Sequence, residues 1–418
     1  MIDDSTRVAV IGAGHGGTAA VALLRQHGFA GSVTLFGAER HLPYHRPPLS
    51  KTSPESGSGS PDPLRPAGFY PDQRIDLRLD SPVLALDPVA ARLRLGDGSE
   101  IPYDVAVLAT GARARRLPVP GADLPGVHTL RTLDDACLLR GGLRPGRRLV
   151  VVGGGYIGLE VAAMARRIGV AVTVLEAATR VLGRSAGPDL AAWLTERHRR
   201  QGTDVVLGAA VERFVPGPDG RVAGVGLADG GEVPCDLVLV GIGAQPCDEL
   251  ARAAGLRCDD GVIVDERGRT SAPGVYAIGD MTRRPLPPYR GLHRLESIPS
   301  AGEQAKQAVT DLLGLPAPRP EVPWFWSDQF DLKLKIAGLP ALAEKSVLRG
   351  GPTDEHRFAA FHLDGAGRVV AAETVNAGGE FMVAKKWIAE GTVVDPDGLA
   401  DTARPLRTLA LEGATCPR

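Results

Sequence analysis

Cysteine is scarce in this sequence, and no two cysteines are spaced for redox or metal chemistry. The 418 residues include five cysteines, an odd number, and none forms a Cys-x-x-Cys pair. Disulfide frameworks, dithiol redox centres and structural zinc sites all depend on paired cysteines. The sequence therefore predicts no disulfide scaffold, no dithiol relay and no metal site. The cysteines are Cys137, Cys235, Cys247, Cys258 and Cys416.

Net charge and long apolar runs are also missing. The sequence has 48 basic and 49 acidic residues, which gives a net charge of -1. There is therefore no global field of the kind that attracts nucleic acid or a membrane surface. The first apolar run, residues 8–12, is far shorter than the roughly 20 residues that cross a bilayer. We expect a cytoplasmic protein that binds neither nucleic acid nor membranes.

The composition indicates a folded chain with several domains. Hydrophobic residues make up 44%, and the 53 glycines and 34 prolines indicate many tight turns. A chain of 418 residues exceeds what one hydrophobic core usually serves, so two or three domains are expected.

One pattern, an apolar strand followed by a glycine cluster and an Ala-rich helix, occurs twice. The first copy has a strand at 7–11, glycines in Gly12-Ala-Gly14-His15-Gly-Gly17, a helix from 18 to about 26 and a strand at 32–36. The second has a strand at 149–152, glycines in Gly153-Gly-Gly155-Tyr156-Ile157-Gly158, a helix from about 159 to 168 and a strand at 171–176.

This arrangement is typical of dinucleotide binding. The first glycine allows a tight turn, the second lets the backbone approach a pyrophosphate, and the third lets helix and strand pack closely. A single Gly-x-Gly-x-x-Gly match also occurs in turns that serve only packing. Two matches in the same strand-turn-helix context predict two nucleotide-binding modules.

An acidic residue ends the last strand of the second copy. The Glu176 carboxylate can accept hydrogen bonds from the adenosine ribose and would repel a 2'-phosphate, which favours NADH over NADPH. The alternative is a solvated glutamate at a strand end, and the nearby Arg180 and Arg184 keep phosphate binding open. Glu39 is the corresponding candidate in the first module.

Three further clusters close predicted buried strands. They are Ala109-Thr110-Gly111, Gly241-Ile-Gly243-Ala-Gln-Pro246 and Tyr276-Ala-Ile-Gly279-Asp280. Asp280 can accept hydrogen bonds from the hydroxyls of a ribityl chain, although each cluster alone could be a turn. Residues 105–109, 237–240 and 275–278 are predicted as the strands.

Two loops and a change of pattern complete the organisation. Residues 52–66 are rich in Ser, Gly and Pro, and residues 281–294 carry Arg283, Arg284, Arg290, His293 and Arg294; both are expected to be exposed. From about residue 323, strands at 358–363 and 369–375 and a helix near 381–388 predict a separate α+β domain.

Together these segments resemble the flavoproteins with two dinucleotide domains, and among them the ferredoxin reductases of the putidaredoxin reductase and rhodocoxin reductase type. The likeness covers nearly the whole chain and is most specific in Pro-Trp-Phe-Trp-Ser-Asp-Gln at 323–329. Other matching segments are 43–51, 130–135, 153–160, 241–246 and 295–299.

The resemblance implies an α/β fold with two Rossmann-like domains and a C-terminal α+β domain. The expected boundaries are 1–116 and 245–322 for FAD, 117–244 for NADH and 323–418 for the C-terminal interface domain. Implied FAD contacts are Gly12, Gly14, His15, Gly17, Glu39, Arg46, Lys51, Val83, Thr110, Gly111, Arg131, Gly279, Asp280, Ile298 and Trp326. Implied NADH contacts are Gly153, Gly155, Tyr156, Ile157, Gly158, Glu176, Arg184 and Gly243.

The chain departs from the family pattern at a few positions. Cys247 and Ser300 stand where the family often has Asn, and the Gly-His-Gly-Gly form of the first motif is uncommon. These differences bear on the identity of the partner.

The absent cysteine pair also selects the reaction. Related disulfide reductases pass electrons from flavin to cysteines early in the chain, but residues 41–46 here read His-Leu-Pro-Tyr-His-Arg. Electrons are therefore expected to leave the flavin directly, and a one-electron iron-sulfur acceptor suits such a flavin. Hydride transfer to flavin needs geometry and electrostatics rather than an acid or nucleophile.

The resemblance assigns Lys51 as the cation near the flavin, Glu160 as its acidic partner and Trp326 as a residue at the electron exit. The alternatives are a surface lysine, a glutamate that suits the helix dipole and a core tryptophan, the last a fair reading of Trp324. The basic residues of 283–294 are either a docking patch for an acidic ferredoxin or an ordinary solvated loop.

The predicted function is thus an FAD-dependent NADH:ferredoxin reductase that feeds an oxygenase through an iron-sulfur ferredoxin, as a monomer or weak homodimer. One alternative is a stand-alone NADH oxidase or a flavin oxidoreductase acting on a small molecule. Another is a non-catalytic redox sensor like the apoptosis-inducing factor branch of the same superfamily.

Overall fold

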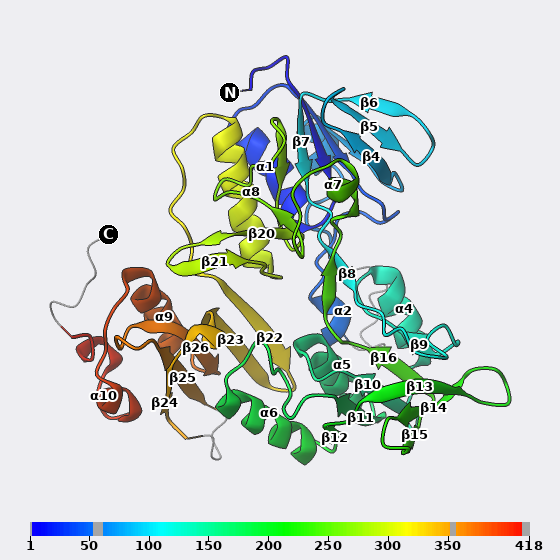
Figure 1. Cartoon of the computed structure of the whole chain (residues 1–418), viewed down its shortest axis with the longest axis vertical. Coiled ribbons are helices and arrows are strands. Elements are labelled where there is room, and N and C mark those ends of the chain that lie inside the picture. Colours follow the sequence, from blue (N-terminus) through cyan, green and yellow to red (C-terminus); the bar gives the residue numbers. More distant parts are fainter. Residues whose placement is uncertain (1, 53–61, 352–356, 412–418) are drawn as a thin grey trace. The chain divides into compact units, whose positions relative to one another are not determined.

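The computed structural model describes residues 2–52, 62–351 and 357–411. By its internal contacts the chain forms two compact units, shown together in Figure 1. The first unit comprises Met1–His45, Ser60–Arg113 and Ala244–Glu321, and the second comprises Arg46–Gly59, Ala114–Gly243 and Val322–Arg418. No helix among the described residues is long and apolar enough to cross a membrane.

A five-stranded parallel sheet forms the centre of the first unit. Its strand order is β19 (Val275–Ala277), β7 (Val105–Leu108), β1 (Arg7–Ile11), β2 (Ser32–Phe36) and β3 (Ile75–Arg78). All four residues of β7 are buried. Such fully apolar strands are typical of parallel sheets covered on both faces.

Helices cover one face of this sheet. α1 (His15–Gln26) and α8 (Ile298–Leu312) pack against each other and lie side by side in Figure 1. Leu24 of α1 and Val309 of α8 join Val10 and Leu35 of the sheet in one buried cluster. A second cluster lies between the sheet and the antiparallel strands β4 (Val83–Asp87), β5 (Arg92–Leu95) and β6 (Glu100–Pro102).

Shorter elements complete the first unit. They are α3 (Phe69–Asp72), α7 (Glu249–Ala253), β18 (Val262–Ile263), β20 (Thr282–Leu286) and β21 (Tyr289–His293); β17 (Ala244–Pro246) pairs with β8 (Ala112–Ala114).

The second unit contains another parallel sheet. Its order is β12 (Asp204–Leu207), β11 (Ala171–Glu176), β10 (Arg148–Val152), β16 (Leu237–Val240) and β9 (Val127–His128). The helices in this part of the second unit are α2 (Pro48–Lys51), α4 (Leu133–Gly142), α5 (Tyr156–Arg167) and α6 (Pro188–Arg200). A three-stranded antiparallel sheet of β13 (Val211–Pro216), β14 (Val222–Leu227) and β15 (Glu232–Pro234) follows.

The C-terminal part of the second unit is an antiparallel sheet with a helix on it. The strand order is β22 (Trp324–Gln329), β23 (Leu332–Gly338), β26 (Val369–Val375), β25 (Phe358–Leu363) and β24 (Lys345–Arg349). α9 (Gly378–Glu390) packs on β23 and β26, as Figure 1 shows. The short α10 (Pro396–Ala400), η2 (Pro340–Leu342) and η3 (Leu406–Thr408) complete it.

The structure confirms the expected α/β class and corrects several predicted boundaries. α1 begins at His15 and α5 at Tyr156, three residues before their predicted starts, because both helices begin directly after the second glycine of the motif. α9 is longer at both ends than predicted. Most of the Ser/Gly-rich segment, residues 53–61, lies outside the described residues.

Candidate active site

The first glycine motif forms a tight turn between β1 and α1. Gly12 has φ +116°, and a Cβ there would lie 2.2 Å from the Ala109 carbonyl oxygen. A Cβ on Gly17 would lie 1.9 Å from the Gly12 oxygen, so the helix can pack here only with glycine. A Cβ on Gly14 would meet no atom of the described residues within 4 Å. The turn thus leaves open space in front of the α1 N-terminus, where backbone N–H groups favour an anion.

The second motif repeats this geometry between β10 and α5. Gly153 has φ +103°, and a Cβ added to it would lie 2.6 Å from the Gly241 oxygen. A Cβ added to Gly158 would lie 2.5 Å from the Gly153 oxygen. Gly155 caps α5, and a Cβ added to it would come within 4 Å of one atom among the described residues, the Gly241 oxygen at 3.7 Å. Both turns therefore have the backbone form that a pyrophosphate requires.

Glu176 ends β11 beside the second turn. Its Oε2 accepts a hydrogen bond from the Gly154 N–H at 2.7 Å, and its Oε1 accepts one from the Ala178 N–H at 2.8 Å. These two bonds fix the carboxylate against the glycine loop. That this carboxylate binds the adenosine ribose of a nucleotide on the turn stays a prediction.

Arg180 and Arg184, the two candidates for binding a 2'-phosphate, make different contacts in the loop after β11. Arg180 donates to the Ala186 and Gly183 carbonyl oxygens at 2.6 and 2.9 Å, so it closes its own loop. The Arg184 guanidinium reaches the backbone of Gly243, where a Cβ would lie 2.9 Å from its Nη2. The structure therefore brings Arg184 and Gly243 together and leaves Arg180 a local role.

Tyr156 and Ile157 begin α5. The Tyr156 ring packs edge-on against Phe325 with centroids 4.9 Å apart. Burial of its hydroxyl, and secondarily the Glu373 carboxylate, raises the pKa of Tyr156 well above its ordinary value. Ile157 is 44% exposed, so the start of this helix presents an apolar surface.

The remaining candidates of the first unit lie around its glycine turn and its core. Gly279 has φ +84° and donates its N–H to Gln304 Oε1 at 3.1 Å, which holds the backbone next to Asp280. The Thr110 hydroxyl donates to the Cys247 carbonyl oxygen at 2.6 Å, and Glu39 accepts a 2.6 Å bond from Tyr44. His15 begins α1, and its ring lies near that of His45. Gly111 has φ +67°. Val83 packs against the second core cluster, and Ile298 is the first residue of α8.

Arg46 and Arg131, both implied FAD contacts, meet in the second unit. Arg46 Nη1 donates to the Arg131 carbonyl oxygen at 2.8 Å. The Arg131 N–H donates to Asp135, whose carboxylate also closes a capping box with Thr132 at the start of α4. A helix cap thus fixes the backbone that receives Arg46.

Lys51 and Glu160 form a partly buried ion pair. The Lys51 Nζ lies 2.8 Å from Glu160 Oε1, and the two side chains are 22% and 5% exposed. Two serine hydroxyls donate to the same carboxylate: Ser327 to Oε1 at 2.6 Å, and Ser50 to Oε2. A buried carboxylate is stable only when paired in this way. The predicted pairing of the two residues is therefore present in the structure, although their role toward a flavin remains a prediction.

An aromatic ladder lies on the C-terminal sheet. The Trp326 and Trp324 rings are 5.8 Å apart, and Trp324 is 5.6 Å from Phe381. The Lys385 ammonium lies 5.1 Å above the Trp324 ring, and that of Lys335 lies 5.3 Å above Phe381. Trp326 is thus one end of a row in which the two tryptophan rings are partly exposed and Phe381 is buried, with positive charge along it.

Comparison with known proteins agrees with this geometry. Residues 6–305 match the family described as pyridine nucleotide-disulphide oxidoreductase, and residues 324–410 match the reductase C-terminal domain. The chain belongs to the pyridine nucleotide-disulphide oxidoreductase family.

Members named as ferredoxin reductases resemble the chain along its whole length. A probable ferredoxin reductase, CtmF, of Castellaniella defragrans is 44% identical over 408 residues, 97% of this chain and 99% of that protein. Rhodocoxin reductase of Rhodococcus erythropolis is 42% identical, covering 94% and 92%. The reductase in a solved covalent putidaredoxin reductase-putidaredoxin complex matches with a TM-score of 0.93 and 38% identity, covering 97% and 98%.

Family membership confirms the predicted oxidoreductase class and its cofactors, FAD and a nicotinamide nucleotide. The residues present fit two such groups. Each glycine turn leaves an open cradle before a helix of 12 residues whose first N–H groups point toward it. The likeness to ferredoxin reductases also confirms the predicted enzyme class.

The arginine-rich segment 281–294 differs from its predicted form. It is the hairpin of β20 and β21, and Arg284 is 4% exposed, paired with Glu303 at 2.6 Å. Arg283 pairs with Asp259, and Arg294 with Asp260 and Glu296. The expected exposure is wrong for Arg284, and acidic neighbours neutralise much of this segment, which weakens its case as a docking patch.

Several residues that hydrogen-bond to distant groups of the site were not predicted from the sequence. Ser50 and Ser327 stand next to Lys51 and Trp326 in the matching segments, but nothing in the pattern links either serine to Glu160. Likewise the buried Glu373 accepts hydrogen bonds from the Gly187 N–H at 3.0 Å and faces His362 Nε2 at 3.0 Å. These contacts tie the C-terminal sheet to the start of α6, and only the fold brings them together.

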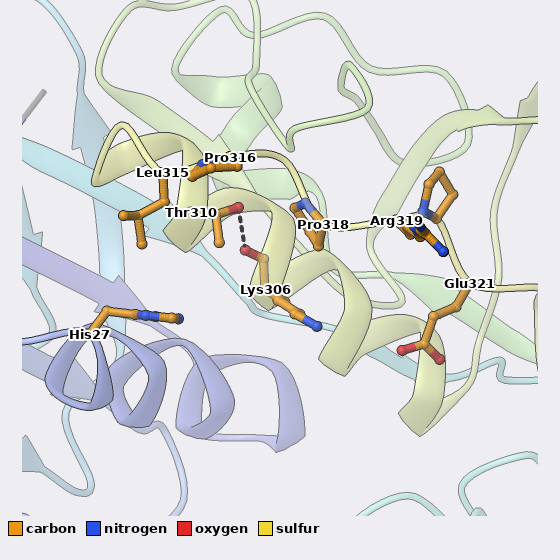
Figure 2. A pocket seen from close by; sticks show the side chains of 9 residues that line it. His27, Lys306, Thr310, Leu315, Pro316, Pro318, Arg319 and Glu321 are labelled. Carbon is orange, nitrogen blue, oxygen red and sulfur yellow. Dashed lines mark hydrogen bonds between the residues drawn. The ribbon is translucent and has the colours of Figure 1, made fainter.

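An open pocket of 710 Å³ lies elsewhere in the first unit (Figure 2). It is formed by the C-terminal half of α8, the following segment to Glu321 and His27 at the end of α1. Thr310 of its lining donates to the Lys306 carbonyl oxygen at 2.8 Å. None of the predicted site residues lines it, so we place neither cofactor there.

Proposed function

We propose that this chain is the NADH-oxidising reductase of an oxygenase system and passes electrons through FAD to a small iron-sulfur ferredoxin. Relatives named as reductase components of the p-cumate, benzene and biphenyl dioxygenase systems share 38 to 39% identity over at least 97% of the chain. The predicted division into FAD, NADH and C-terminal domains, and a cytoplasmic location, are part of the proposal.

One observation carries the proposal. Residues 41–46, which correspond to the segment where disulfide reductases carry redox cysteines, contain no cysteine, and Lys51 shortly after them pairs with the buried Glu160. A positive charge held by a buried partner favours an electron-rich ring beside it, and residues 41–46 offer no thiol to receive electrons. Electron transfer directly from a flavin to an external acceptor fits this arrangement.

The chain's own residues would bind and orient the two nucleotides. Gly12, Gly14 and Gly17 would receive the FAD pyrophosphate, and Asp280 and Arg46 would bind other parts of that cofactor. Gly155 and Gly158 would receive the NADH pyrophosphate, and Glu176 its adenosine ribose. The bound flavin would supply the conversion of one hydride into two single electrons.

The aromatic ladder is the proposed surface for the ferredoxin. The partly exposed rings of Trp326 and Trp324 lie next to each other at the surface, the buried Phe381 packs behind Trp324, and Lys335 and Lys385 place positive charge along the row. Local positive potential attracts an acidic partner even where the net charge of the chain is -1. The proposed site therefore combines positive charge that attracts the ferredoxin with aromatic rings through which electrons can leave.

The test is an anaerobic titration of the purified protein with NADH and, separately, NADPH, followed by visible absorbance. One equivalent of NADH should bleach the flavin bands, and NADPH should do so poorly. NADH turnover should then rise strongly on adding putidaredoxin, the ferredoxin named with the similar solved structure. A protein that lacks flavin absorbance would refute the proposal. Fast NADH oxidation that no added ferredoxin stimulates would instead support a stand-alone oxidase.

A further inference from the structure

The Glu160 carboxylate receives more hydrogen bonds than its ion pair with Lys51 requires. Ser327 from β22 donates to Oε1, the oxygen that faces Lys51, and Ser50 from α2 donates to Oε2. Three donors from two segments therefore contact one side chain of α5. Glu160 itself is 6% exposed, so water contributes little to this site.

These donors fix the plane of the carboxylate. The terminal torsion of a glutamate is broad, and a single ammonium partner leaves the carboxylate free to turn. Donors on both oxygens remove that freedom. Because Lys51 Nζ binds Oε1, fixing the carboxylate also fixes the position of the ammonium group.

A second layer sets the direction of the Ser327 hydroxyl. Gln329 Nε2 donates to Ser327 Oγ at 3.1 Å, so the serine proton is directed to Glu160. His198 Nε2 lies 2.9 Å from Gln329 Oε1, and an amide oxygen only accepts, so this histidine nitrogen carries a proton. Burial lowers the pKa of His198 to about 4, which keeps the ring neutral at neutral pH. The order of donors thus runs from His198 through Gln329 and Ser327 to Glu160.

We propose that Ser50 and Ser327 are positioning residues for hydride transfer. They hold Glu160, and through it the Lys51 ammonium, in the orientation that favours the reduced flavin. They also partly neutralise the carboxylate, because a hydroxyl donor offsets negative charge on the oxygen it binds. This inference rests on the proposed function, which places Lys51 and Glu160 beside the flavin.

Removing the hydroxyls should change the flavin environment more than the fold. In Ser50→Ala/Ser327→Ala, more of the Glu160 charge would reach the flavin and disfavour its anionic reduced form. Thr195→Val is the matched control. Its hydroxyl is equally buried in the same unit but donates to the Ala191 carbonyl oxygen within α6.

The experiment measures two quantities on FAD-loaded protein. The first is the flavin midpoint potential, measured with a reference dye; the second is the rate constant of flavin reduction at saturating NADH. We expect the double variant to lie about 30 mV more negative, which equals a tenfold change for a two-electron couple. We also expect a roughly tenfold slower reduction with unchanged NADH affinity. Thr195→Val should match the wild type. Ser327→Thr, which keeps a hydroxyl, should retain most of the wild-type potential and reduction rate that Ser327→Ala loses.

The outcomes separate this inference from the proposed function. A double variant that keeps FAD and shows wild-type potential and rate would overturn the positioning role alone. A wild-type protein whose flavin NADH does not reduce would overturn the proposed function and this inference with it. If the double variant loses FAD, each single variant decides the matter, since each is expected to shift the potential in the same direction by a smaller amount.

Discussion

At the residue scale, Glu176 shows how neighbouring backbone sets the use of a side chain. Its two oxygens accept N–H groups from Gly154 and Ala178, so the carboxylate cannot turn away into solvent. Each oxygen retains a lone pair for a ribose hydroxyl. The solvated strand-end alternative does not require these bonds, and their presence supports the nucleotide role.

Replacing Glu176 should therefore change nucleotide preference. In Glu176→Ala we expect kcat/KM for NADH to fall about tenfold, the value of one or two lost hydrogen bonds of about 1 kcal/mol each. The value for NADPH should rise, because the charge that repels its 2'-phosphate is gone. Steady-state kinetics with both nucleotides test this, with the exposed Glu212→Ala as control. An unchanged ratio of the two values would contradict the assignment.

His198 is the second residue whose neighbours decide its behaviour. It is fully buried, and burial lowers its pKa to about 4 from the ordinary 6.5. Below pH 6.5 the unfolded chain binds a proton that the folded chain refuses, so stability falls from pH 6.5 to about 4 and then levels off.

The His198→Gln variant should lack this part of the acid sensitivity. The wild type should lose about 3 kcal/mol more than the variant between these pH values, as the size of the shift implies. Denaturant unfolding at several pH values, followed by tryptophan fluorescence, measures the difference. Parallel pH curves for the two proteins would mean that His198 is protonated without penalty.

At the scale of elements, β22 has two functional faces. Side chains alternate along a strand, so Phe325, Ser327 and Gln329 share one face while Trp324 and Trp326 share the other. The first face contacts Tyr156, Glu160 and His198, and the second forms the aromatic ladder. One strand thus links the residues proposed for hydride transfer to those proposed for electron exit.

The ladder face gives a prediction about the partner. Lys335→Glu/Lys385→Glu should raise KM for putidaredoxin at least tenfold at low salt, because like charges then face an acidic partner. The reduction of flavin by NADH should not change. Lys345→Glu, an exposed lysine on the opposite edge strand β24 of the same sheet, is the control. Equal effects of both charge reversals would indicate general electrostatics rather than docking at the ladder.

At the scale of the whole molecule, the two units carry different reporters. All four tryptophans, Trp193, Trp324, Trp326 and Trp387, belong to the second unit, whereas the first glycine turn belongs to the first. Tryptophan fluorescence therefore follows unfolding of the second unit alone. Circular dichroism follows both.

Removal of FAD should affect the circular dichroism signal more than the fluorescence signal, because the glycine turn proposed for its pyrophosphate lies in the first unit and the second unit holds only some of the predicted FAD contacts, such as Arg46 and Arg131. A ligand at 1,000 times its Kd stabilises the folded state by about 4 kcal/mol, on the order of 10 °C in Tm for a unit of this size. We expect the apoprotein to show a lower Tm by circular dichroism, and a smaller decrease by fluorescence. Differential melting with and without FAD checks this, and Gly14→Val, which fills the open cradle, should abolish the stabilisation. Identical shifts in both signals would show that the two units unfold together.

The repeated strand-turn-helix pattern and the α/β class could be predicted from the amino-acid sequence alone. Glycine positions report backbone geometry directly: Gly12 and Gly153 both have positive φ, and Gly17 and Gly158 both leave no room for a side chain. Runs of apolar residues likewise located β7 and β16 to within one residue. These features are local, because a few neighbouring residues decide them.

Which distant side chains meet, by contrast, depends on how the whole chain folds. Ser50 and Ser327 converge on Glu160 from segments 110 and 167 residues away, and Arg284 of a predicted exposed loop is buried against Glu303. Hydrogen bonds and ion pairs depend on distances of a few ångströms between side chains. Spacing along the chain carries that information only within one helix or strand, so the partners of Glu160 and Arg284 had to come from the fold.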